Sequence, residues 1–434
     1  MFCLQIFIGS LILICSTFCQ NCERNPNNAS MCTFSGIQRS MQMDELTDSN
    51  PDEIKRIKFV NSFINRIPIK LTEIYKNLVD LDVSNSLVCV LRDQYFKGGK
   101  LQKLNASGNV ISYLESNINN VLQNLEVLDL SRNRIQVLED NVFYYFTKLK
   151  YLNLSHNEIK KLPANFTSYT DNVNVLDLGN NQISSLAGDF SSKNSRSNAV
   201  NLSNNLLVSI DPMSFKNLFR LNINFNKLEK IINFQGTNIK ELLICGNSLQ
   251  LLIINKQLVI LDVSYNNGNS LEIDFGSESA LECLKLSNLK LFDYTDILAN
   301  ISKLNNLMHL DLSMSNLTTF DFDNNMLPKS IKVLNLMNTQ LKVLKNFKNI
   351  LTAAPNLKEI ILNGNFLKDK ELWDISKKFG INVTGLEITD ETITEEIKTK
   401  TILFSDHNII IIVAVSMNIL LFIINLYLTA TLHA

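Results

Sequence analysis

The stretch LEVLDLSRNRIQVL at residues 125–138 decides the architecture, because the chain repeats it. Aliphatic residues stand at the first, fourth, sixth, eleventh and fourteenth places of this frame, and Asn stands at the ninth. The next two turns fill the frame with LKYLNLSHNEIKKL at 149–162 and VNVLDLGNNQISSL at 173–186. A fixed period of this kind predicts a solenoid, in which no single unit can bury its apolar face alone.

The frame fits the chain fourteen times, and successive copies begin 19 to 26 residues apart, most often 24. The copies begin near residues 54, 78, 101, 125, 149, 173, 197, 218, 239, 258, 281, 307, 331 and 357. We expect each unit to hold a short strand with inward-pointing leucines, then a bend and a return segment that often carries a Phe. Stacked units would place these strands side by side in one parallel sheet.

The ninth place of the frame has a physical reason of its own. Nine of the fourteen copies hold Asn there. A side-chain amide inside the coil can satisfy backbone groups that the bend leaves unpaired, and such a group costs ~1 to 3 kcal/mol when it is buried without a partner. Four copies substitute a hydroxyl, at Ser62, Ser86, Ser315 and Thr339, and the frame fits worst where Leu289 offers nothing polar.

Over residues 54–370 the repeat resembles that of the extracellular leucine-rich repeat family, including Toll-like receptor ectodomains and insect cell-surface and immune proteins, here without an intracellular signalling domain. The resemblance implies an α/β solenoid, a horseshoe with a concave parallel sheet. It also implies an N-terminal cap over 20–53, closed by a disulfide between Cys22 and Cys32. The apolar spacing and Gly stop after residue 370 predict a C-terminal capping helix within 371–384.

The chain ends predict secretion and a membrane tether. Residues 1–19 are apolar and end in small or neutral residues, as a signal peptide does. Residues 409–428 carry no formal charge and are long enough to span a ~30 Å hydrocarbon layer. This arrangement gives a stalk over 385–408 and a short cytoplasmic tail over 429–434, with a lipid anchor as the alternative. Asn418 and Asn425 share one face of the spanning helix, where they would pair with a second helix or be tolerated near its ends.

Signal cleavage would leave five cysteines in an oxidising compartment, an odd number. Outside the cap these are Cys89, Cys245 and Cys283. Cys245 and Cys283 fall two coils apart, a spacing of ~10 Å that is too long for a disulfide. One reading makes these residues buried thiols, and the other assigns Cys89 or Cys245 an intermolecular disulfide in a homo- or hetero-dimer.

Sequons for N-glycosylation agree with secretion. The best placed are Asn28, Asn165 and Asn382, expected in the cap or in loops, and further ones are Asn300, Asn316 and Asn153. Asn153, like Asn105 and Asn201, occupies an outward strand position where the repeat itself generates Asn-x-Ser, so these three are weaker candidates.

No catalytic constellation emerges from the sequence. The two His of the repeats, His156 and His309, are expected to be solvated, and no His/Cys/Asp/Glu cluster has metal-ligand spacing. Formal net charge is −1 and the basic residues are dispersed, which does not favour nucleic-acid binding. We therefore expect neither an enzyme nor a cofactor.

The outward-facing strand positions change character along the chain. In the early coils they are polar, as at Asp129 and Asn153, with serines such as Ser131 and Ser155 two residues on. From the eighth coil they become apolar, which predicts a partner surface, because exposed apolar patches often mark interaction sites. Its residues are Phe219, Phe225, Leu243, Val259 and Tyr265, with Cys245, Ile260 and Met314 extending it. The alternative is that the short coils here shift register and turn these side chains inward.

Two functional classes remain open. The first is a membrane-tethered recognition, adhesion or co-receptor protein that binds an extracellular protein through its concave face. The second resembles the insect immune repeat proteins that act as disulfide-linked or lipid-anchored complexes. The odd cysteine count favours the second, and the apolar C-terminal segment favours the first.

Overall fold

The computed structural model describes residues 20–37, 46–47, 49–98, 100–190, 198–266, 271–289, 294–322, 327–365, 367 and 370–385. The chain divides into two compact units, one of Met1–Phe366 with Leu372–Gly385 and the other of Leu367–Glu371 with Leu386–Ala434. The account below concerns the first unit. The expected signal peptide and everything from residue 386 on, including the expected spanning segment, lie outside the described residues. None of the described helices is long and apolar enough to cross a membrane.

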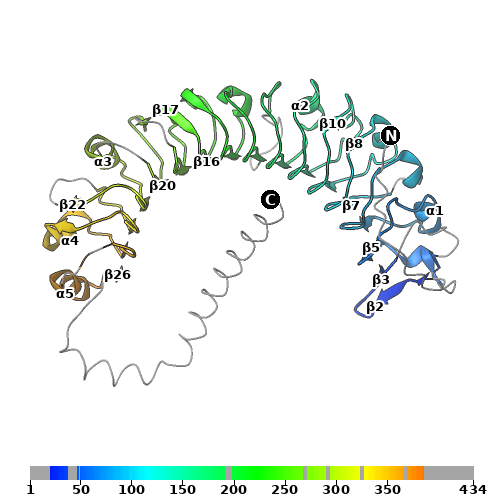
Figure 1. The fold of residues 1–434 in the computed structure, drawn as a ribbon, viewed down its shortest axis with the longest axis horizontal. Helices are drawn as coiled ribbons and strands as arrows, with labels where there is room; N and C mark the ends of the chain where they lie inside the picture. The colour runs from blue at the N-terminus through cyan, green and yellow to red at the C-terminus, as the bar shows by residue number, and fades with distance from the viewer. Residues whose placement is uncertain are drawn as a thin grey trace, which may run out of the picture. The chain divides into compact units, whose positions relative to one another are not determined.

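A single large sheet runs through the first unit and lines the inner edge of its arc (Figure 1). It begins with β2 (Glu23–Asn25), antiparallel to β3 (Asn28–Ser35), and every later neighbour is parallel. The later strands are β5 (Arg56–Val60), β6 (Asp80–Asp82), β7 (Lys103–Asn105), β9 (Val127–Asp129), β11 (Tyr151–Asn153), β12 (Val175–Asp177), β13 (Ala199–Asn201), β14 (Arg220–Asn222), β16 (Glu241–Leu243), β18 (Ile260–Asp262), β20 (Cys283–Lys285), β21 (His309–Asp311), β23 (Val333–Asn335), β25 (Glu359–Ile361) and β26 (Asn382–Thr384). Each copy of the sequence frame holds one strand of this sheet, and β3 and β26 extend it at either end.

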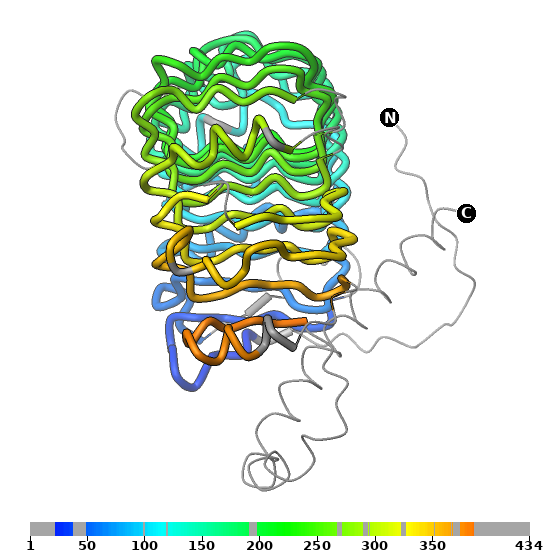
Figure 2. The backbone as a smooth tube through the Cα atoms, turned by 90° about the vertical axis from the view of Figure 1, so that its left-hand side faces the viewer, coloured from blue at the N-terminus to red at the C-terminus, as the bar shows by residue number. Residues whose placement is uncertain are grey.

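The rest of each coil is short and irregular, so that successive coils stack as parallel turns (Figure 2). Smaller parallel sheets pair β1 (Gln20–Asn21) with β4 (Leu46–Thr47), β8 (Tyr113–Leu114) with β10 (Val137–Leu138), and β22 (Thr319–Asp321) with β24 (Val343–Lys345), and join β15 (Glu229–Asn233), β17 (Ser248–Ile253) and β19 (Glu272–Asp274). The α-helices are α1 (Leu71–Ile74), α2 (Phe166–Tyr169), α3 (Thr295–Ile301), α4 (Ile350–Ala353) and α5 (Lys370–Phe379). Single 3-10 turns are η2 (Pro51–Glu53), η3 (Asp93–Tyr95), η4 (Ser116–Asn120), η5 (Pro212–Phe215) and η6 (Phe347–Asn349).

A ladder of asparagines ties the coils together, as the ninth place of the frame predicts. The Oδ1 of Asn157 accepts a hydrogen bond from the backbone N–H of Ile135 in the preceding coil (3.0 Å). Its Nδ2 donates to the carbonyls of Leu130, Leu154 and Ser155 at 3.0 to 3.2 Å. The same pattern recurs from Asn109 to Asn266, and each of these asparagines is buried. One amide per coil therefore satisfies backbone groups of two coils.

The frame's leucines are buried beneath the sheet, and phenylalanines fill the outer half of the core. Phe143 meets Phe166 of the next coil at a ring-centroid distance of 5.4 Å, and Phe190 meets Phe215 at 5.3 Å. At the weakest copy of the frame, Leu289 is itself buried, and the buried hydroxyl of Tyr294 donates to its carbonyl at 2.5 Å.

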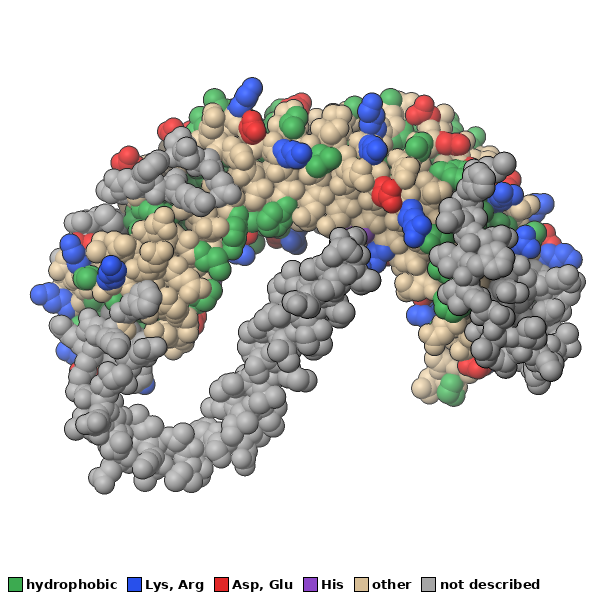
Figure 3. Space-filling view, viewed as in Figure 1, with side chains coloured by type: hydrophobic (Ala, Val, Ile, Leu, Met, Phe, Trp, Pro, Cys, Tyr) green, Lys and Arg blue, Asp and Glu red, His purple; other side chains and the backbone are tan. Residues whose placement is uncertain are grey.

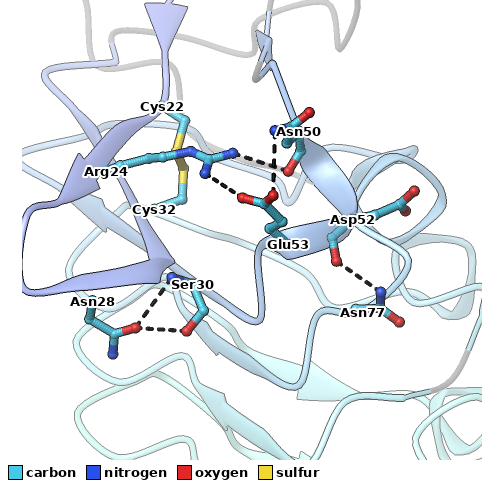
Figure 4. A network of polar contacts seen from close by, with 9 residues as sticks. All are labelled: Cys22, Arg24, Asn28, Ser30, Cys32, Asn50, Asp52, Glu53 and Asn77. Atoms are coloured by element: carbon cyan, nitrogen blue, oxygen red, sulfur yellow. Dashed lines mark hydrogen bonds and ion pairs between the residues drawn. A yellow bond between two sulfur atoms is a disulfide. The ribbon is translucent and has the colours of Figure 1, made fainter.

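The N-terminal cap is held by one disulfide and a polar network (Figure 4). Cys22 and Cys32 are bonded, with Cα atoms 5.4 Å apart, which confirms the expected pair. Arg24 forms an ion pair with Glu53 at 2.7 Å and donates to the carbonyl of Asn50 at 3.1 Å. These contacts fasten the β2–β3 hairpin to the turn that leads into the first coil.

At the other end, α5 precedes the last strand of the sheet. The helix ends at Phe379, and Gly380 takes a left-handed conformation (φ 66°) before the chain turns into β26. Residues 382–384, expected within the capping helix, are thus a strand paired with β25. Asn382 consequently lies on an edge strand, where it is exposed, and not in a loop.

Candidate partner-binding surface on the concave face

The residue just before the ninth place of the frame adopts a left-handed backbone in every coil. These residues are Asn61, Asn85, Gly108, Arg132, His156, Asn180, Asn204, Phe225, Gly246, Tyr265, Asn288, Met314, Asn338 and Gly364, with φ between 49° and 73°. Nine of them are Asn or Gly, the residue types that adopt this conformation most readily. The turn from strand to return segment therefore favours Asn or Gly at this position, and five coils have another residue there.

Three of the five exceptions are large apolar residues on alternate coils, Phe225, Tyr265 and Met314. We call them the apolar ridge. A left-handed backbone costs an ordinary L-residue about 1 kcal/mol or more, so these positions give up local stability. Their side chains are also exposed, at 50%, 37% and 41% of their surface. The buried part of each side chain at most offsets this strain, so folding stability gives these residues no advantage over Asn or Gly.

Specific contacts build the ridge. A Cβ at Gly246 would lie 2.3 Å from Cδ1 of Phe225, so the ring of Phe225 lies over the glycine of the next coil. The hydroxyl of Tyr265 donates to Sδ of Met314 at 3.1 Å, passing over the coil between them. From the eighth coil to the twelfth the ridge covers ~20 Å, at ~4.8 Å per strand. Hydrophobic atoms gather along the inner edge of the arc beside β16 and β20 in the space-filling view (Figure 3).

The structure separates the five predicted partner residues into three zones. Phe225 and Tyr265 follow the strands, Leu243 ends β16 and is half-buried, and Phe219 and Val259 precede β14 and β18. Phe219 is 40% exposed, and Val259 is half-buried. The strand residues keep the register of the earlier coils, with Asn222 opposite Leu243 and Leu243 opposite Asp262. The alternative in which the short coils turn these side chains inward is therefore wrong.

Charged pairs across neighbouring strands flank the apolar zone. Arg220 of β14 meets Glu241 of β16 at 3.4 Å, and Lys285 of β20 meets Asp262 of β18 at 3.9 Å. Both pairs are partly exposed and contribute little to stability. Both pairs lie on the strands, between Phe219 and Val259 at the strand starts and the ridge beyond the strand ends, so charged and apolar groups alternate across this surface.

One expected column of outward side chains is buried. Ser131 and Ser155 retain 7% exposure, because each backbone N–H bonds to the Asp or Asn two residues earlier and turns the serine under the rim. Cys245 occupies the same column and is also 7% exposed. Burial raises the pKa of its thiol to about 11. In this conformation the thiol is shielded from a partner chain, and the intermolecular disulfide expected of Cys245 stays a prediction.

The other cysteines outside the cap are partly exposed. The Cys89 thiol contacts the carbonyl of Asn65 at 3.4 Å, and the intermolecular bond expected of Cys89 stays a prediction. Cys283 is half-buried on β20, and burial raises the pKa of its thiol. Within the described residues Cys245 and Cys283 form no disulfide with each other.

The sequons and histidines occupy surface positions. Asn165, Asn300, Asn316 and Asn382 are exposed, whereas Asn28 and Asn153 are half-buried. Burial and the nearby Arg132 lower the pKa of His156, whose ring contacts the amide of Asn180 at 3.3 Å, so it is neutral at physiological pH. The described residues contain no group of three His, Cys, Asp or Glu side chains that could hold a metal ion.

Comparison with known proteins shows which folds this geometry resembles. A model of the leucine-rich repeat matches residues 123–183. Among solved structures, a leucine-rich repeat protein of Leptospira interrogans is similar at 23% identity and TM-score 0.63, covering 83% of this chain and 92% of that one. The APL1 leucine-rich repeat domain is similar at 20% identity and TM-score 0.52, covering 85% of each chain. A leucine-rich repeat protein from Bacteroides eggerthii has 15% identity and TM-score 0.56, with 77% of this chain and 61% of that one covered.

At these identities the likeness extends to the fold alone. No curated protein sequence matches this chain. The repeat frame, the asparagine ladder and the parallel sheet give this chain the fold of leucine-rich repeat proteins, and residues 123–183 match the leucine-rich repeat itself.

Proposed function

We propose that this protein is an extracellular recognition protein of about fourteen leucine-rich repeats, which binds a protein partner through the apolar ridge on its concave side. The observation that carries the proposal is the ridge itself. Three large apolar residues hold the left-handed position that recurs in every coil, where Asn or Gly would be less strained. Residues that break a local folding rule with no net gain in stability are expected at functional sites.

The dimensions of the surface suit a protein partner. The ridge is ~20 Å long and lies beside half-buried Leu243 and the cross-strand ion pairs, so a partner would cover apolar and polar groups together. Aromatic residues and methionine are enriched at the centres of protein interfaces. The fold supplies a rigid support for the ridge, because the asparagine ladder fixes each coil to the next.

The chain ends complete the proposal. A signal peptide over 1–19 would send the repeats outside the cell, and an apolar segment over 409–428 would tether them to the membrane, with the repeats external. Exposed sequons at Asn165, Asn300, Asn316 and Asn382 suit this topology. The function would then be recognition, adhesion or a co-receptor role at the cell surface.

A paired substitution tests the binding role. The full chain, displayed on cells, is compared with a Phe225→Asp/Tyr265→Asp variant for capture of proteins from the extracellular fluid and cells of its source. Ile69→Asp and Val137→Asp serve as controls, because both side chains are exposed (41% and 60%) and belong to the first and fourth coils, at least four coils before Phe225. We expect the ridge variant to lose a protein that the parent and both controls retain. Retention by the ridge variant would remove the ridge from the proposal.

A further inference from the structure

A second surface has no part in the proposed function. On the return side of the third and fourth coils, two exposed tyrosines and four small polar residues line an open surface hollow of about 470 Å³. Its lining residues are Ser116, Asn117, Asn120, Asn141, Tyr144 and Tyr145. The first three come from η4, and the others follow β10 one coil later.

The tyrosine rings form a braced corner. Tyr144 and Tyr145 meet at 83° with ring centroids 4.7 Å apart, so one ring is a wall beside the other. Tyr169 of α2 meets Tyr144 at 88° and 5.2 Å, and its hydroxyl donates to Oδ1 of Asn141 at 2.8 Å. Tyr144 and Tyr145 nevertheless keep 50% and 42% of their surface exposed. Tyr169 thus supports the ring of Tyr144, while the rings of Tyr144 and Tyr145 remain accessible to a ligand.

The chemistry of the lining favours a neutral sugar. None of the six lining residues carries a charge, and three of them are carboxamides, which offer a donor and an acceptor side by side. Adjacent hydroxyls of a pyranose ring present the complementary pair, and its C–H face packs against the negative face of an aromatic ring. The volume lies in the range of small-molecule sites, ~300 to 1,000 Å³, and the patch is far smaller than the ~800 Å² that a stable protein interface buries on each partner.

We propose that this hollow binds a neutral hexose or N-acetylhexosamine unit. A sugar unit of this kind can come from two sources. It can belong to an external oligosaccharide, or to the chain's own N-glycan on Asn165. Asn165 is exposed and precedes α2, and its carbonyl accepts the backbone N–H of Tyr169 at 3.3 Å, so the two residues stand one helical turn apart. The second source alone rests on the proposed extracellular location.

The test uses the full chain produced in eukaryotic cells and purified in detergent, with chitotriose as the probe, because β-linked N-acetylglucosamine is also the first unit of an N-glycan. The variants are Tyr144→Ala/Tyr145→Ala, Asn120→Ala and Asn165→Gln, and Tyr113→Ala is the control, a 40% exposed tyrosine outside the hollow. Two quantities are measured: the Kd for chitotriose by calorimetry, and the rate at which an amidase releases the Asn165 glycan from the folded chain. Unfolding midpoints confirm that each variant folds.

If the hollow binds an external oligosaccharide, chitotriose should bind the parent and Asn165→Gln with the same Kd. The Kd should then rise ~10-fold in the double tyrosine variant and measurably in Asn120→Ala. If the hollow binds the chain's own glycan on Asn165, chitotriose should bind only Asn165→Gln, in which that glycan is absent. The amidase should then release the Asn165 glycan ~10-fold faster from the double tyrosine variant than from the parent. The proposal is overturned if both readouts match between parent and double variant, or if Tyr113→Ala changes them equally. Loss of a captured protein in the double variant, with both sugar readouts unchanged, would also overturn it in favour of a protein surface.

Discussion

Replacing Phe225 with Asn should leave the stability of the protein almost unchanged. The left-handed backbone at this position (φ 52°) costs Phe about 1 kcal/mol relative to a residue suited to it, and Asn removes most of that strain. Against this gain stands the half of the ring that is buried over Gly246. Full burial of a Phe side chain is worth ~1.5 to 3 kcal/mol, so half of it contributes ~1 kcal/mol. The two terms cancel, and the net change should stay within about 1 kcal/mol of zero.

Urea denaturation of the parent and the variant measures this directly. Phe215, which is fully buried in the core of the preceding coil, provides the contrast. Phe215→Ala should cost ~3 to 5 kcal/mol, the range for a core Phe. A loss above ~2 kcal/mol in Phe225→Asn would show that the ring packs as part of the fold, because it exceeds any value that half-burial can supply. The argument that the ridge exists for binding would then fail.

Three further outcomes follow from the same structure. Asn157→Ala removes an amide that serves two coils and leaves a buried N–H without its acceptor, so unfolding by urea should require ~3 kcal/mol less free energy, and a loss under ~1 kcal/mol would count against the ladder. Gly246→Ala places a Cβ against the ring of Phe225, at a residue with a left-handed backbone (φ 67°). The substitution should lower the free energy of unfolding by ~1 kcal/mol. It should also weaken partner capture by displacing the ring, although residue 246 itself has no side chain that a partner could contact. Burial raises the pKa of the Cys245 thiol to about 11, so iodoacetamide at pH 8 should alkylate it only after unfolding, as peptide mass spectrometry would reveal; rapid alkylation of the folded chain would contradict its burial.

The parts of the fold that obey the repeat were predictable from the sequence. Leucine spacing gave the strands their inward face, and the amide at the ninth place gave the coils their ladder, because both are set by local chemistry that recurs. Asn157 illustrates this, since its four hydrogen bonds join groups whose positions follow from the frame.

Other features depend on contacts between coils and could not be read from the frame. Ser131 counted as outward by strand alternation, yet the turn made with Asp129 buries it. Residues 382–384 carry too little pattern to distinguish a strand from the end of a helix. The corner of Tyr144 and Tyr145 combines two coils and a helical turn, which the frame treats as variable.

The candidate site was predicted in part. Phe225 and Tyr265 were identified because large apolar residues replaced polar ones in a recurring position, and this signal needs no structure. The left-handed backbone that makes them costly was missed, although the frequent Asn and Gly at that place carried the signal. Phe219 and Val259 were grouped with them, because a list of outward positions does not distinguish the two ends of a strand.

Site-specific photo-crosslinking tests the central claim most directly. A benzophenone amino acid is placed in the full chain at residue 225, at residue 265 or at residue 137, where exposed Val137 lies away from the ridge. After illumination with cells and extracellular fluid of the source, we expect one and the same protein to be joined to the chain from residues 225 and 265, and none from residue 137. A partner joined from residue 137 but from neither ridge position would contradict the account, because the partner would then dock outside the ridge.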